Sequence, residues 1–175
     1  LPLIITILGL LGFIGNSLTF LHPTLRKNSF SMYTLSGSFV DIINLFVNLF
    51  PIYLSPLTGN VQLTIPISWV CKVRLFVLVF LPQLSMNLLI MSLIDRYACT
   101  HDLTSRIRLI LQLKMVPRLI GITILISSVS SIYSPILNDI VSNYGCDSTQ
   151  PMINGLLYIL IHGIITPLVM LILVL

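Results

Sequence analysis

The strongest constraint on the fold is a stretch of 20 uncharged residues, Leu75–Ile94. At about 1.5 Å rise per residue, a helix of this length spans about 30 Å, the thickness of a bilayer core. Basic residues precede the stretch, and Asp95-Arg96 follow it. The stretch is therefore predicted to be the apolar part of a membrane-spanning helix over residues 72–99.

The composition extends this interpretation to the whole chain. The sequence is 56% hydrophobic and 8% charged, with a mean hydropathy of +1.04. A soluble domain needs more charged surface than this. We therefore predict an all-α membrane protein, a single transmembrane helix bundle over residues 1–175. The predicted helices cover residues 1–22, 29–57, 72–99, 117–137 and 151–175.

Polar residues inside the predicted spans are candidates for function, because they are costly in lipid unless they have partners. Asp41 is the one charge of the second span, where we expect it to lie deep in an apolar environment. It can be a functional acid, a structural acid that bonds to Asn16 of the first span, or both. Gly12 and Gly15 have the spacing of a helix-packing face. His162 of the fifth span is interpreted as an interhelical or pore-facing hydrogen-bonding residue.

The charges outside the spans predict the orientation. Seven basic residues fall on the side of Arg96, and two, Lys72 and Arg74, fall on the other side. By the positive-inside rule, the side of Arg96 is cytoplasmic and the N-terminus is extracellular. The net charge of +4 is explained by this topology, and we expect no nucleic-acid partner. The seven residues are Arg26, Lys27, Arg96, Arg106, Arg108, Lys114 and Arg118.

Several motifs together suggest a family. Asp95-Arg96-Tyr97 closes the third span, and Cys71 lies 25 residues before Arg96. This arrangement resembles the third helix of rhodopsin-like (class A) G-protein-coupled receptors, with a looser likeness to invertebrate peptide receptors. The order of further residues is similar to that of the family. These are Gly15-Asn16, Asp41, Ser85, Cys146 and Pro167.

The resemblance implies a seven-helix bundle of which five helices are present here. It implies that Asp95, Arg96 and Tyr97 form the activation switch that meets a heterotrimeric G protein. It also implies that Asn16, Asp41 and Ser85 form a polar core able to hold Na⁺, and that no other cofactor is needed. Two positions depart from the family pattern. Gly37-Ser38 replace the usual leucine-alanine pair before Asp41, and Leu125 stands at the usual tryptophan position of the fourth helix.

The resemblance also implies features of the outer side. Leu78, Pro82 and His162 are expected in a ligand pocket, and Pro167 is expected to bulge the fifth helix. Leu78 stands where amine-binding members carry an aspartate, so a peptide ligand is favoured over an amine. Cys71 and Cys146 lie on the extracellular side, where an oxidising environment favours a disulfide. The implied location is the plasma membrane, with membrane lipids around the bundle.

Other functions remain open from the residues. A polytopic transporter or channel could use Asp41, His162 and Asn16 as a polar path, but no internal repeat supports it. The sequence begins and ends within apolar runs, so a truncated, non-signalling fragment of a receptor is a further alternative. An enzyme is not expected, because no paired acids, no nucleophile with a base and no glycine-rich phosphate loop are found.

Overall fold

A computed structural model of the chain describes residues 2–20, 22, 28–54, 68–100, 115–141, 145–148 and 151–174. These residues form helices joined to one short hairpin. The helices are α1 (Pro2–Phe20), α2 (Ser29–Leu54), α3 (Ser68–Thr100), α5 (Val116–Ser131), α6 (Tyr133–Leu137), α7 (Pro151–Tyr158), the π-helix η1 (Ile159–Ile165) and α8 (Thr166–Val174). The strands are β1 (Asn138–Val141) and β2 (Gly145–Ser148).

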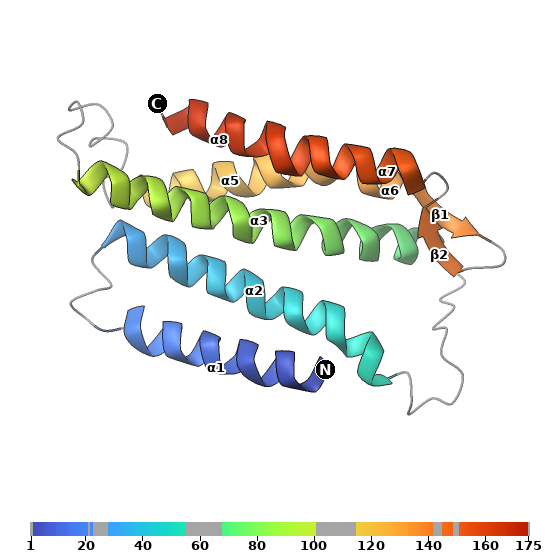
Figure 1. Cartoon of the computed structure of the whole chain (residues 1–175), viewed down its shortest axis with the longest axis horizontal. Coiled ribbons are helices and arrows are strands. Elements are labelled where there is room, and N and C mark those ends of the chain that lie inside the picture. Colours follow the sequence, from blue (N-terminus) through green and yellow to red (C-terminus); the bar gives the residue numbers. More distant parts are fainter. Residues whose placement is uncertain are drawn as a thin grey trace.

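The helices form a bundle with α3 at its centre. Successive long helices run in opposite directions, and α7, η1 and α8 continue one another as a single rod (Figure 1). Helix α3 contacts α2, α5, α6, α8 and β1, whereas α1 packs on α2. One end of the bundle carries the N-terminus and the hairpin, and the other carries the C-terminal end of α3 (Figure 1). We refer to them as the hairpin end and the Arg96 end.

Four helical segments are long and apolar enough to cross a membrane. They are Ser29–Leu49, Cys71–Tyr97, Val116–Leu137 and Pro151–Val169. The apolar part described for α1, Ile4–Phe20, is shorter. The predicted all-α membrane fold is therefore confirmed for the described residues, with four spans that meet the length criterion and a fifth, shorter apolar helix.

The buried core is small and lies where α2, α3 and α5 meet. It consists of Tyr33, Leu84, Leu88, Met91 and Val116. Many large apolar side chains elsewhere in the bundle point outwards and are exposed. In water such a surface would be an aggregation hazard, but in a bilayer it faces hydrocarbon of the same polarity.

The break between α5 and α6 has a local cause. Pro135 has no backbone N–H, and its ring crowds the carbonyl group four residues earlier, which belongs to Ser131. Helix α5 ends at that residue, and Ile132 N–H bonds back to Val129 O at 3.3 Å. The predicted fourth span, 117–137, is therefore two helical pieces in one line.

Two expectations about local structure were wrong. Residues 138–150, between the fourth and fifth predicted helices, were expected to be an outer loop, but β1 and β2 pair antiparallel within this segment, with Ile140 opposite Cys146. The packing face on α1 also differs from the prediction. A Cβ atom on Gly12 or Gly15 would meet nothing within 4 Å, whereas one on Gly9 would lie 3.1 Å from Leu45 Cδ1. Close packing of α1 on α2 therefore depends on Gly9.

Candidate functional site

The Asp95-Arg96-Tyr97 motif lies on the last turns of α3 and presents its side chains in different directions. Asp95 is 1% exposed and faces the start of α2, whereas Arg96 and Tyr97 are exposed. Successive helical residues point about 100° apart, so adjacent positions must divide between the interior and the surface. The motif thus combines a buried acid with an accessible base.

The carboxylate of Asp95 lies in an unusual polar environment. Both of its oxygens are buried without a well-formed hydrogen bond from any group that the structure describes. The Ser29 hydroxyl and the backbone N–H of Phe30, at the N-terminus of α2, are the donors that act on this carboxyl group. The helix dipole and free N–H groups of such a terminus favour a negative charge. Asp95 therefore sits where the end of α2 can stabilise its charge.

Tyr33 completes this buried region and was not singled out in the sequence. It is 0% exposed, and its Oη has no hydrogen-bond partner within the described part of the chain. It lies four residues after Ser29, on the same face of α2. This spacing of four residues is the sequence feature from which Tyr33 could have been predicted, because a helix that directs Ser29 towards α3 also directs Tyr33 there.

Arg96 contacts α2 through an aromatic ring. Its guanidinium carbon Cζ lies 3.8 Å from the centroid of the Phe30 ring. A cation over an aromatic face is attracted by the ring quadrupole.

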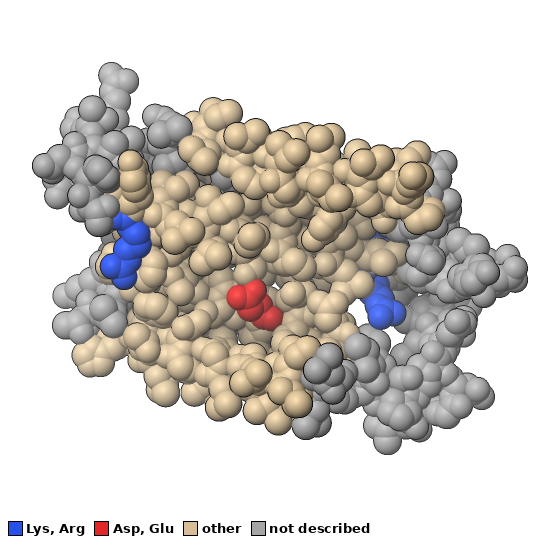
Figure 2. All heavy atoms as spheres, in the orientation of Figure 1, with Lys and Arg blue, Asp and Glu red and all other residues tan. Residues whose placement is uncertain are grey.

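The charged side chains on one face of the bundle are separated. Basic side chains are visible near both ends of the face shown in Figure 2, with a carboxylate close to its middle.

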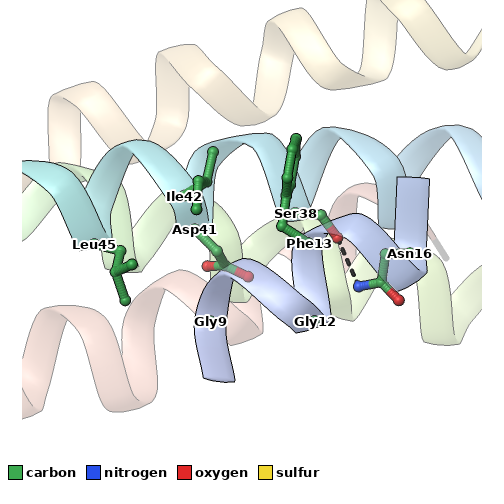
Figure 3. A pocket seen from close by; sticks show the side chains of 8 residues that line it. All are labelled: Gly9, Gly12, Phe13, Asn16, Ser38, Asp41, Ile42 and Leu45. Carbon is green, nitrogen blue, oxygen red and sulfur yellow. Dashed lines mark hydrogen bonds between the residues drawn. The ribbon is translucent and has the colours of Figure 1, made fainter. Parts of the chain in front are cut away.

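The second candidate site is a notch between α1 and α2 (Figure 3). It has a volume of about 200 Å³ and contains Asn16 and Asp41. Asn16 donates from Nδ2 to Ser38 Oγ at 2.9 Å, so its described partner is Ser38 rather than Asp41. The full lining is Gly9, Gly12, Phe13, Asn16, Ser38, Asp41, Ile42 and Leu45.

The structure brings two of the three predicted polar-core residues, Asn16 and Asp41, to this notch. Asp41 is exposed at the surface of the bundle within the span of α2, because small residues of α1 leave its face of α2 uncovered. Ser85, predicted to join the same polar core, is on α3 and is not among the lining residues of the notch. The residues present offer one carboxylate, one amide and one hydroxyl oxygen, the ligand type that a hard cation prefers. The donor set therefore fits Na⁺ in part.

At the hairpin end, His162 joins η1 to α6. Its Nε2 lies 3.1 Å from Tyr133 Oη, and its ring centroid lies 4.9 Å from that of Tyr158. The interpretation of His162 as an interhelical hydrogen-bonding residue is confirmed. Leu78 and Pro82 are half-buried on α3. The described polar and ring contacts of His162 do not involve them, so a shared ligand pocket stays a prediction.

The segment before Pro167 is a π-helix. Both the backbone N–H and the Oγ1 of Thr166 bond to Ile161 O, five residues earlier, and the Oγ1 distance is 2.7 Å. Because Pro167 cannot donate and crowds the preceding turn, a wider turn there relieves the clash. His162 lies within this π-helix and is 8% exposed.

A polar seam between α3 and α5 was missed by the sequence analysis. Asn87 is 0% exposed and donates from Nδ2 to Ser127 Oγ at 2.8 Å, and Gln83 Nε2 lies 3.4 Å from Asn87 Oδ1. The sequence feature that could have predicted the seam is the amide of Asn87 in the middle of the span, four residues after the amide of Gln83. Leu125, at the usual tryptophan position, is 65% exposed and takes no part in the seam.

Comparison with known proteins does not identify a relative: no protein-family model matches the chain, and no curated protein is significantly similar to it in sequence. Among the described residues, no group of three or more histidine, cysteine, aspartate or glutamate side chains could hold a metal ion. The candidate function therefore depends on the Arg96 end and on the notch.

Proposed function

We propose that this protein is a receptor of the rhodopsin-like type, which transmits the binding of an extracellular peptide to a heterotrimeric G protein. The observation that carries the proposal is the division of the motif at the Arg96 end. A buried Asp95 and an exposed Arg96 are adjacent on the central helix of a membrane bundle. A permanently charged, planar guanidinium is suited to bind backbone carbonyls of an inserted partner.

The proposed mechanism is a shift between two packings of the bundle. A ligand at the hairpin end that binds one packing more tightly raises its population. Helix α3 runs from the hairpin end to the Arg96 end and contacts most of the other helices, so it is suited to couple the two. In the proposed orientation the hairpin end and N-terminus face outside the plasma membrane, in agreement with the positive-inside rule.

We further propose a disulfide between Cys71 and Cys146 at the hairpin end. Cys71 is buried and disulfide-bonded. The sequence has three cysteines, and Cys99 is 28 residues from Cys71 on α3, about 42 Å away along a helix. Cys146 belongs to β2, whose partner strand β1 contacts α3. Such a bond would hold the hairpin across the start of α3.

The notch with Asp41 is proposed as a regulatory site for a hard cation such as Na⁺. Asn16 and Ser38 line it with Asp41, and their oxygens could serve as further ligands. An ion bound there would need ligands beyond these three oxygens, which water held in the notch or another helix packed over it could supply.

The transporter alternative has less support. Asn16 and Asp41 lie in the notch between α1 and α2, whereas His162 bonds to α6. Helix α3 stands between these two parts of the bundle (Figure 1). The three polar residues therefore do not form one path.

The test of the proposed function is nucleotide exchange. Membranes from cells that express the protein are mixed with purified heterotrimers of each G-protein class and a fractionated peptide extract. We expect binding of a non-hydrolysable GTP analogue to exceed that of membranes without the protein. If no heterotrimer responds to any fraction while the protein is present at the cell surface, the proposal fails.

A further inference from the structure

The Arg96 end contains a stack of side chains from three helices. Arg96 of α3 lies over the face of Phe30 of α2, with Cζ 3.8 Å from the ring centroid. Phe20 of α1 meets the same ring edge-on, with centroids 5.9 Å apart and planes at 70°. We refer to these three residues as the Arg96 stack.

The two aromatic residues of the stack have different relations to Arg96. The guanidinium contacts Phe30 directly, so the quadrupole of that ring is what attracts the charge. Phe20 contacts Phe30 edge-on, so it can act on Arg96 by fixing the Phe30 ring. Phe30 is also the second residue of α2, so its ring is fixed by a helix that packs along α3.

The stack keeps the charged group of Arg96 against α2. A partner that binds the guanidinium from the Arg96 end competes with the ring for the same group. Cation–aromatic attraction of the strength typical of exposed to partly desolvated sites changes such an equilibrium by roughly twofold to thirtyfold. The attraction to the Phe30 ring is thus strong enough to change the fraction of molecules in which the Arg96 guanidinium can bind a partner.

We propose that Phe30 is a positioning residue that restrains Arg96 and thereby lowers the activity of the protein in the absence of ligand. This inference rests on the proposed coupling to a G protein. It assigns to an aromatic residue of α2 the restraint of a cationic residue on α3. Release of Arg96 from the ring is then one step of the transition to the partner-binding packing.

The variants follow from the geometry. Phe30→Leu keeps an apolar side chain at the position but removes the aromatic face, whereas Phe30→Trp keeps a face for the cation. Phe39→Leu is the matched control, because Phe39 is on the same helix and makes a comparable edge contact to Phe13, with centroids 5.2 Å apart. It is away from Arg96.

The first readout needs no partner. In the purified protein with ¹⁵N-labelled arginine, the Nε–H signal of Arg96, assigned by its loss in Arg96→Lys, should be shifted by the Phe30 ring current. We expect the shift to vanish in Phe30→Leu and to persist in Phe30→Trp and Phe39→Leu. An Arg96 signal unaffected by Phe30→Leu would overturn the inference by removing its contact.

The second readout is nucleotide exchange without ligand, at equal surface expression. Phe30→Leu should raise basal exchange roughly twofold to thirtyfold, with Phe30→Trp and Phe39→Leu near wild type. If wild type responds to a peptide fraction but Phe30→Leu leaves basal exchange unchanged, the inference is wrong and the proposed function stands. If wild type never responds, the proposed function fails and this inference fails with it.

Discussion

Asn16 of α1 and Ser38 of α2 are joined by a hydrogen bond of 2.9 Å from Nδ2 to Oγ, beside the exposed carboxylate of Asp41. The pair is a polar link between these two helices. In lipid, an amide without a partner is costly, so the bond both satisfies Asn16 and fixes how α1 lies on α2. It also leaves the carboxylate of Asp41 available in the notch.

Removal of this bond should loosen α1. We expect Asn16→Ala and Ser38→Ala each to lower the free energy of unfolding in bilayer discs by about 0.6–2 kcal/mol, as is typical of interhelical hydrogen bonds in membranes. The double variant should cost less than the sum. Thr19→Ala is the control, because Thr19 Oγ1 bonds to Gly15 O within α1. Fully additive losses would contradict the assigned pair.

Loss of a hydrogen bond in the polar seam between α3 and α5 should lower the free energy of unfolding more than loss of the Asn16–Ser38 bond. Ser127→Ala leaves the buried amide of Asn87 without its described acceptor, and a buried unsatisfied group costs about 1–3 kcal/mol. We expect a loss of that size in the free energy of unfolding, measured by denaturation in bilayer discs. Ser130→Ala is the matched control, since its hydroxyl bonds only to Ser127 O of the same helix in the described contacts. Equal effects of the two variants would argue against the seam.

The link between His162 and Tyr133 should hold η1 against α6. Tyr133→Phe removes one oxygen and keeps the ring, so we expect it to destabilise the protein by about 0.5–1.5 kcal/mol. Tyr158→Phe should have little effect, because the described contact of Tyr158 with His162 is between rings. The two variants are compared by thermal unfolding at constant detergent concentration. A larger loss for Tyr158→Phe would reverse the assignment.

The disulfide proposal predicts a simple labelling pattern. Alkylation of the denatured protein without reductant should add one group, at Cys99, and reduction before alkylation should add three. Intact mass gives both numbers, and peptide mapping identifies the positions. Cys71→Ser should expose the thiol of Cys146 to the same reagent. Labelling of Cys146 in the unreduced wild-type protein would exclude the proposed pair.

The sequence predicted the helices better than their contacts. Charged residues at both ends of Leu75–Ile94 mark where α3 enters and leaves lipid, because charge is costly in hydrocarbon. No such signal tells which face of α2 is covered by α1, so the exposure of Asp41 on the bundle surface was not predicted. The hairpin was missed because two four-residue strands have too short a pattern to stand out.

The hydrogen-bond partners of the amides within the spans were also harder to predict from the sequence than the helices themselves. Asn16 was expected to have a partner, and the structure gives Ser38 instead of Asp41. Asn87 was not considered, although an amide within an apolar span needs a partner as much as Asn16 does. Which hydroxyl satisfies an amide depends on how the helices are rotated, and this is decided by packing rather than by the order of residues in one span.

The most direct test of the central claim compares two basic residues at the Arg96 end. Arg96→Ala and Arg118→Ala each remove one exposed charge there, from α3 and from α5. At matched surface expression, with the peptide fraction that activates wild type, we expect Arg96→Ala to abolish nucleotide exchange by the G protein and Arg118→Ala to keep most of it. Equal exchange in the two variants, or full exchange in Arg96→Ala, would contradict the account.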